Sequence, residues 1–141
     1  MMMHFTSGLV LSSIFQTAHV VPSSEYPIPD MHGELNNNWA VHQLYTTCDY
    51  APKSTVFSWL IGGLNYQVEH HLFPNISHVH YKNISEIVQT KAKEFELPYH
   101  VNKNFVTAVW QHIKMLKLLG RDQNSFQISF SASKNDNAMA V

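Results

Sequence analysis

The first long apolar stretch of the chain runs from Phe5 to Val21 and contains no charged side chain. Its length is close to the lower limit for a helix that crosses a bilayer. A secretory signal peptide would begin with basic residues and end at a small-residue cleavage site. The first Lys or Arg is Lys53, and Thr17-Ala18-His19-Val20 is a poor cleavage site. We therefore predict that residues 1–21 are the end of a transmembrane helix, with a buried helix of a soluble protein as the alternative.

The pattern changes after Val21, where turn-forming residues replace the apolar run. The segment VPSSEYPIPD contains three prolines, and MHGELNNNW is rich in Gly and Asn. Such composition is typical of a loop rather than of a core element. The following WAVHQLYTTCDY is aromatic and weakly amphipathic, as segments at a membrane interface are. We predict a loop and interfacial segment over residues 22–53.

Residues 54–82 combine an apolar helical pattern with strong helix breakers. Ser54 or Thr55 is suited to cap a helix that runs to about Leu72, with an interruption at Gly62-Gly63. Pro74 disfavours helical geometry at the residue before it and ends this helix.

The remainder of the chain has the pattern of two amphipathic helices followed by a polar C-terminal segment. Two 3.6-residue patterns cover residues 83–121, and Pro98 and Gly120 follow their ends. Residues 122–141 have few large apolar side chains and predict a disordered tail. The apolar positions expected to face a core are Ile84, Ile87, Val88, Ala92 and Phe95 in the first helix, and Phe105, Val109, Ile113, Leu116 and Leu119 in the second.

Composition excludes several classes of protein. Only 13% of the 141 residues are charged, 45% are hydrophobic, and the net charge is −1, which does not indicate a nucleic-acid partner. The single cysteine, Cys48, excludes an internal disulfide and a CxxC motif, and we expect a buried structural thiol. Histidine is abundant, with ten residues, and imidazole is the commonest protein metal ligand.

Three side chains of the segment around residue 70 have the spacing of one helix face. Gln67, His70 and His71 occupy positions i, i+3 and i+4 in an apolar run. An apolar helix makes an unpaired polar side chain costly, and a metal ion would satisfy all three. The alternative is a pair of surface histidines where the helix leaves the membrane. Glu69 lies on another face, as a residue that supports a ligand or contacts solvent.

Three further histidines and one asparagine are possible site residues. His19, at the end of the apolar segment, is costly there unless it is paired, coordinated or at the interface, so it is a ligand candidate. His78 and His80 are two residues apart and do not share a helix face, which favours polar contacts over ligation. Asn65 is near enough in sequence to orient a ligand or a water.

Other catalytic motifs are absent from the sequence. There is no HExxH of zinc proteases, no Glu-x-x-His of soluble di-iron bundles, and neither GxGxxG nor GxSxG.

The segment GGLNYQVEHHLFPNI resembles the membrane fatty acid desaturases, and within them the front-end acyl-lipid or acyl-CoA type. Their third histidine box is Gln-x-x-His-His, which here is Gln67-Val-Glu-His70-His71. The similarity extends to FQTAHV, to WAVHQLYTTCDYAP and to ELPY, and covers roughly residues 5–120.

This resemblance implies an all-α, membrane-associated fold with a cytosolic helical cap, and a site of two non-haem iron ions on the cytosolic side of a multi-pass membrane protein. It implies that His70 and His71 are catalytic and bind metal, and that Gln67 and His19 are further metal residues. The implied reaction uses dioxygen and two electrons to place a double bond in an acyl chain. The implied partners are a fatty acyl-CoA or acyl-lipid substrate, an electron donor such as cytochrome b5 or ferredoxin, and the membrane.

The sequence also departs from the family pattern, because two earlier histidine boxes have no counterpart in it. We therefore expect a C-terminal portion of a desaturase that is inactive by itself. The alternatives are a non-catalytic membrane-associated metal-binding or interaction module that uses residues 82–120 for docking, a small secreted protein, and an oxygen-inserting hydroxylase relative.

Overall fold

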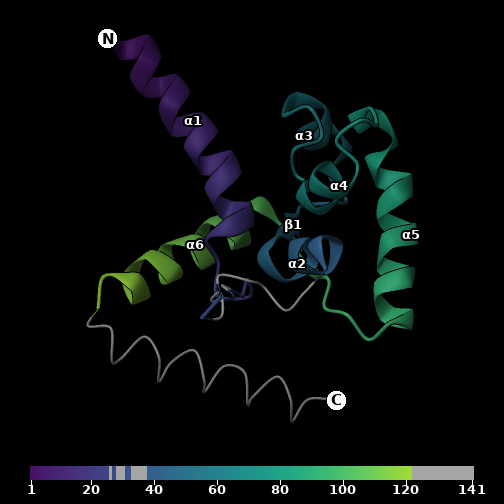
Figure 1. The fold of residues 1–141 in the computed structure, drawn as a ribbon. Helices are drawn as coiled ribbons and strands as arrows, with labels where there is room; N and C mark the ends of the chain where they lie inside the picture. The colour runs from purple at the N-terminus through teal and green to yellow at the C-terminus, as the bar shows by residue number, and fades with distance from the viewer. Residues whose placement is uncertain (26, 28–30, 33–37, 122–141) are drawn as a thin grey trace.

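A computed structural model describes residues 1–25, 27, 31–32 and 38–121. The structure is mostly helical, as predicted, with two short strands that were not predicted (Figure 1). The predicted disordered tail, residues 122–141, lies outside the described residues. The elements are α1 (Met2–His19), α2 (Trp39–Thr46), β1 (Cys48–Tyr50), α3 (Thr55–Leu60), α4 (Gln67–Leu72), η1 (His78–His80), α5 (Tyr81–Glu94), β2 (His100–Asn102) and α6 (Phe105–Leu119).

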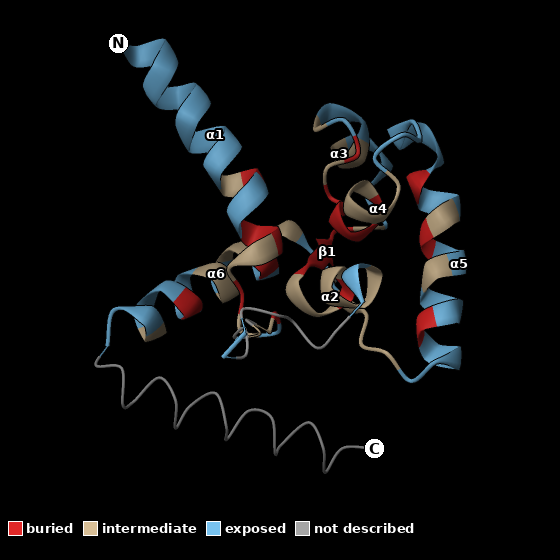
Figure 2. Cartoon of the chain, in the orientation of Figure 1, coloured by how far each residue is buried: buried red, intermediate tan, exposed pale blue. Residues whose placement is uncertain are grey.

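Helix α1 extends away from the rest of the molecule, and most of its side chains are exposed (Figure 2). Only its C-terminal end is packed, through Ile14, Thr17 and Ala18, which are buried against β1 and α6. Within the described residues, no helix combines the length and apolarity that crossing a membrane requires. The assignment of residues 1–21 to the end of a transmembrane helix stays a prediction.

The two strands form a small parallel sheet at the centre of the fold. Cys48 of β1 pairs with His100 of β2, and Tyr50 pairs with Asn102. All three residues of β1 are buried, although this segment was predicted to be loop and interface. Three-residue strands are too short to show an alternating pattern, and their pairing joins segments about 50 residues apart. No local pattern in the sequence therefore predicts them.

The predicted helix over residues 54–72 is divided where the glycines predicted an interruption. Helix α3 ends at Leu60, and Gly62 and Gly63 both have positive φ angles, of 64° and 73°. Helix α4 then begins at Gln67 and ends at Leu72, two residues before Pro74. The turn between α3 and α4 sets the direction in which α4 presents its side chains.

Both C-terminal helices form where expected but pack through different faces. In α5 the buried residues are Tyr81, Ser85 and Ala92, whereas Ile87 is exposed, as is Phe95 just beyond the helix. In α6 the buried residues are Ala108 and Met115. The apolar positions predicted to face a core in α6 include Ile113, Leu116 and Leu119, and these are exposed. The prediction is confirmed for Ala92, Val88 and Phe105, which belong to or pack on the apolar clusters of the core. It is wrong for the exposed positions, where the apolar stripe is wider than the side that packs.

Two apolar clusters flank the strands. The first contains Ala18, Tyr50, Ala51 and Ala108, with Phe57 and Phe105 packed on them. The Tyr50 hydroxyl donates a 3.0 Å hydrogen bond to the Ile14 carbonyl, which ties β1 to α1. The second cluster contains Leu44, Val68 and Ala92 and joins α2, α4 and α5. Helix α4 is therefore held between α2, α5 and β1.

Candidate metal centre

Helix α4 carries three of the four predicted site residues, and its start is fixed by a carboxylate. Asp49 Oδ1 accepts a 2.9 Å hydrogen bond from the Val68 backbone N–H, one of the N–H groups that a helix start leaves unpaired. At the other end, the Phe73 N–H donates to the Glu69 carbonyl, and Pro74 follows. This short helix is thus held at its start by Asp49 of β1 and is closed at its end by its own backbone.

The structure brings all four predicted residues together. The ring centroids of His19 and His71 are 5.0 Å apart, although His19 comes from the end of α1. The ring of His71 lies 5.8 Å from that of His70, and its Nε2 lies 3.4 Å from Nε2 of Gln67. On the other side, His70 Nδ1 is 3.4 Å from the Tyr81 hydroxyl. Three imidazoles and one amide therefore line one small region.

Burial lowers the pKa of His19 and of His71 and so favours their neutral forms. Burial, together with the positive charges that His19 and His70 can carry, lowers the pKa of His71 to about 4. A neutral imidazole has a lone pair free for a metal ion. Gln67 is buried, and its Oε1 has no hydrogen-bond partner in the part of the chain that the structure describes. A buried amide oxygen without a partner is costly and is suited to accept an ion or a donor.

These residues fit part of a metal site but do not complete one. Among residues 1–25, 27, 31–32 and 38–121, no three His, Cys, Asp or Glu side chains are arranged to hold a metal ion. An ion bound beside these four residues would therefore need further ligands.

Asp49, Glu69 and Tyr99 form a buried acidic cluster that contacts α4. Of these residues, only Glu69 was predicted to support the site. The Tyr99 hydroxyl lies 2.6 Å from Asp49 Oδ2, 2.8 Å from Glu69 Oε1 and 3.1 Å from Ser85 Oγ. Burial, followed by the charge of Asp49, raises the pKa of Glu69 to about 9. Burial likewise raises the pKa of Asp49. The suggestion that Glu69 contacts solvent was wrong, because its side chain is fully buried.

Two clues in the sequence pointed to this cluster. Asp49 is an isolated acidic residue in an aromatic, apolar segment, where a buried carboxylate requires partners. Tyr99 lies in the ELPY motif, which the resemblance already included. Their pairing joins positions 50 apart and has no local pattern.

The weaker candidates have structural contacts. Asn65 accepts a 2.6 Å hydrogen bond from Ser58 Oγ and donates a 3.5 Å one to the Ala51 carbonyl, so its side chain holds the turn before α4. His78 and His80 lie in η1 and are exposed. Cys48 is buried, as predicted, and its burial raises the pKa of the thiol to about 12.

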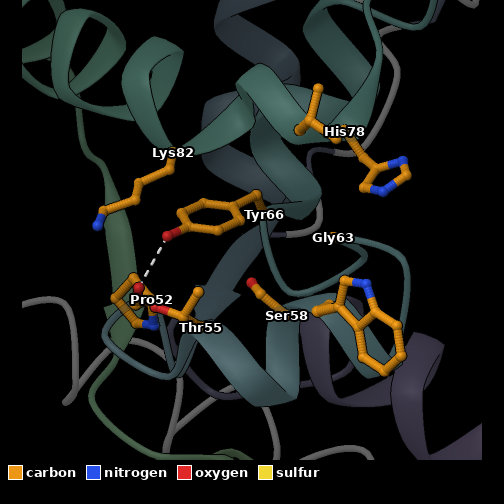
Figure 3. A pocket seen from close by; sticks show the side chains of 9 residues that line it. Pro52, Thr55, Ser58, Gly63, Tyr66, His78 and Lys82 are labelled. Carbon is orange, nitrogen blue, oxygen red and sulfur yellow. Dashed lines mark hydrogen bonds between the residues drawn. The ribbon is translucent and has the colours of Figure 1, made fainter.

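A hollow of about 180 Å³ opens beside α4, on the side of α3 and η1 (Figure 3). Tyr66 and Lys82 lie on one side of it, and the Tyr66 hydroxyl donates a 2.7 Å hydrogen bond to the Pro52 carbonyl. Pockets for small-molecule ligands usually measure about 300–1,000 Å³. The hollow is smaller than that, and we assign no substrate to it.

Comparison with known protein families matches residues 1–103 to the family described as fatty acid desaturase. The chain therefore belongs to the fatty acid desaturase family, whose members are oxidoreductases that act on acyl chains. No solved structure matches the chain.

Curated relatives agree with this assignment. The chain is 38% identical over 119 residues to the sn-1 linoleoyl-lipid 6-desaturase of Synechocystis, an alignment covering 84% of this chain and 33% of that protein. It is 43% identical over 114 residues to the acyl-lipid (8-3)-desaturase of Physcomitrium patens, covering 81% and 24%. It is 36% identical over 136 residues to the delta(5) fatty acid desaturase A of Dictyostelium discoideum, covering 94% and 29%. The chain thus spans a third or less of the length of these relatives.

Proposed function

We propose that this chain is the C-terminal part of a di-iron membrane fatty acid desaturase of the front-end type. The whole enzyme would introduce a double bond into an acyl chain, with dioxygen and two electrons as co-reactants. The observation that carries the proposal is the Gln67-x-x-His70-His71 box with the His19 ring 5.0 Å from His71, in a chain of the desaturase family.

In this proposal, His19, Gln67, His70 and His71 contribute to holding the two iron ions. Iron, when bound, would supply the oxygen activation needed to remove hydrogen from unactivated C–H bonds. The remaining ligands would come from two further histidine boxes outside these 141 residues. The isolated chain would therefore be inactive.

The roles of this chain's own residues follow from their contacts. Burial keeps His71 neutral at physiological pH, so that its ring is available to a metal ion. The Tyr81 hydroxyl lies within reach of His70 Nδ1 and would fix the orientation of that ring, leaving Nε2 for the ion. Asp49 holds the start of α4 and so fixes the position from which these side chains project.

The proposed substrate class is a fatty acyl chain on a lipid or on coenzyme A. The names of the Synechocystis and Physcomitrium relatives favour an acyl lipid. The proposed electron donor is a cytochrome b5 or a ferredoxin. The proposed location is a membrane, with the histidine boxes of a multi-pass protein on its cytosolic side.

The test uses the complete reading frame that encodes this chain, expressed in yeast supplied with polyunsaturated fatty acids. Gas chromatography of fatty acid methyl esters should show a new double bond, and His70→Ala or His71→Ala should abolish it. Iron content per purified protein should fall in both variants. His80→Ala is the matched control, because His80 is exposed in η1, and it should retain activity and iron.

Retained desaturation in either variant would reject the assignment of His70 and His71. Stoichiometric metal binding by the 141-residue chain, with no activity in the complete reading frame, would instead support the metal-binding module.

A further inference from the structure

The side of α6 that faces solvent carries a row of large apolar side chains. Val106 is 78% exposed and Trp110 is 57% exposed, and Ile113 and Leu116 are about half exposed. These positions are spaced by three or four residues and therefore lie along one face. The opposite face packs on the molecule through Ala108 and Met115. The exposed row is thus a second apolar face, exposed in the structure, of a helix that is already anchored.

The same helix and its flanks carry only positive charge. Between Glu96 and Asp122, the sequence contains no acidic residue. It contains four of the chain's nine Lys and Arg residues, and all four are exposed: Lys103, Lys114, Lys117 and Arg121. By contrast, the exposed side of α5 mixes Lys91 and Lys93 with Glu86 and Glu94, and Lys91 pairs with Glu94 at 2.7 Å. The positive character is therefore specific to the α6 region.

The lysines are interleaved with the apolar row rather than placed behind it. Lys114 follows Trp110 by one helical turn, and Lys117 follows Ile113 by one turn. Long lysine side chains can lay their methylene stems along apolar surface and extend the ammonium group to a polar layer. Tryptophan prefers the boundary between apolar and polar layers. Together these features are those of a helix that lies in a membrane surface.

We infer that the exposed face of α6, formed by Val106, Trp110, Ile113 and Leu116 with Lys114 and Lys117, is a peripheral binding surface for a bilayer that contains anionic lipids. Anionic head groups would pair with the lysines, and the apolar row would enter the boundary of the acyl region. This inference is independent of the proposed reaction.

The position of α6 in the fold agrees with this inference. It packs against the C-terminal end of α1, where His112 Nδ1 lies 2.9 Å from the Val20 carbonyl, and it runs across that end rather than alongside α1 (Figure 1). The free part of α1 is itself apolar and exposed (Figure 2). If the free part of α1 were inserted in a bilayer, α6 would thus lie at the surface of that bilayer. A nucleic acid would pair with the lysines but would leave the apolar row without a partner.

The first experiment measures binding of the 141-residue chain to vesicles. Phosphatidylcholine vesicles with and without 30% phosphatidylglycerol are compared by flotation at low and at high salt. We expect binding to favour the anionic vesicles, and we expect Lys114→Gln/Lys117→Gln to reduce that binding roughly 10- to 30-fold. Lys114→Arg/Lys117→Arg should retain it, as should the control Lys91→Gln/Lys93→Gln on α5. Equal binding of the wild-type chain to both vesicle types would overturn the inference.

The second experiment locates the contact without altering a lysine, so it remains decisive if the Gln variants do not fold. Trp39→Phe/Trp59→Phe leaves Trp110 as the single tryptophan of the chain. We expect its emission to shift to the blue on adding anionic vesicles and to be quenched by brominated acyl chains. Unchanged Trp110 emission while the chain floats with vesicles would show that α1 alone binds lipid, and would overturn the inference. Because neither experiment measures desaturation, an inactive complete reading frame would reject the proposed function and leave this inference standing.

Discussion

The hydroxyl group of Tyr99 lies 2.6 Å from Oδ2 of Asp49, 50 positions earlier in the chain, and 2.8 Å from Oε1 of Glu69. A phenol has one proton and can donate to only one of these oxygens at a time. Two buried carboxylates so close together cannot both be charged without a large cost. The raised pKa of Glu69, about 9, means that this carboxyl group carries the additional proton at neutral pH. The cluster therefore joins β1, α4 and the segment before β2 through a single shared hydrogen-bond network.

Removing the Tyr99 hydroxyl should destabilise the protein while leaving the shape of the side chain. We expect Tyr99→Phe to lower the free energy of unfolding by roughly 1 to 3 kcal/mol, because it leaves buried carboxyl oxygens without a donor. Urea denaturation followed by circular dichroism measures this change. Tyr45→Phe is a suitable control, since Tyr45 lies in α2 and is not part of the hydrogen-bond network of Tyr99. An equal effect of the two substitutions would contradict the importance of the cluster.

The shared proton also predicts how stability depends on pH. Folding raises the pKa of Glu69 from about 4.5 to about 9. The contribution of this shift to the free energy of unfolding is therefore complete below pH 4.5 and is lost as the pH rises toward 9. Stability should be measured between pH 6.5 and 8.5, where the titration of His71 does not interfere. Folding lowers the pKa of His71 to about 4, so this residue destabilises the folded state only below about pH 6.5.

In this window the free energy of unfolding of the wild-type chain should fall with rising pH. Glu69→Gln keeps the shape and removes the proton equilibrium, so its stability should depend less on pH. Glu94→Gln changes an exposed carboxylate paired with Lys91 and should keep the wild-type slope. Parallel slopes for wild type and Glu69→Gln in urea titrations would exclude a protonated Glu69.

The predicted parts of the fold are those that depend on residues close together in the sequence. The break at Gly62-Gly63 and the end before Pro74 follow from backbone geometry, and Gln67, His70 and His71 lie near one another because of helical spacing. The packed faces of α5 and α6 could be predicted only in part. An apolar stripe marks side chains that avoid water, but it does not distinguish those that pack on the core from those that stay exposed. The β1–β2 pair and the Tyr99–Asp49 contact join distant segments and depend on the whole fold.

The Cys48 thiol should be unreactive in the folded protein. It is buried, and desolvation followed by the charge of Asp49 raises its pKa to about 12. Because the thiolate is the reactive form, labelling with a disulfide reagent at pH 8 should be on the order of a hundredfold or more slower than in denaturant. Absorbance of the released thiolate follows both reactions. Rapid, stoichiometric labelling of the native chain would contradict the buried position of β1.

The two glycines between α3 and α4 offer a matched test of how the turn positions the histidine helix. Both have positive φ, which an alanine adopts at a cost of about 1 to 2 kcal/mol. A Cβ on Gly62 meets no atom within 4 Å, whereas one on Gly63 would lie 2.8 Å from the Cβ of His78. Gly62→Ala should therefore show the backbone cost alone, and Gly63→Ala a further ~1 to 3 kcal/mol from the collision. Urea denaturation of the two variants gives the difference directly, and equal losses would mean that η1 does not pack against this turn.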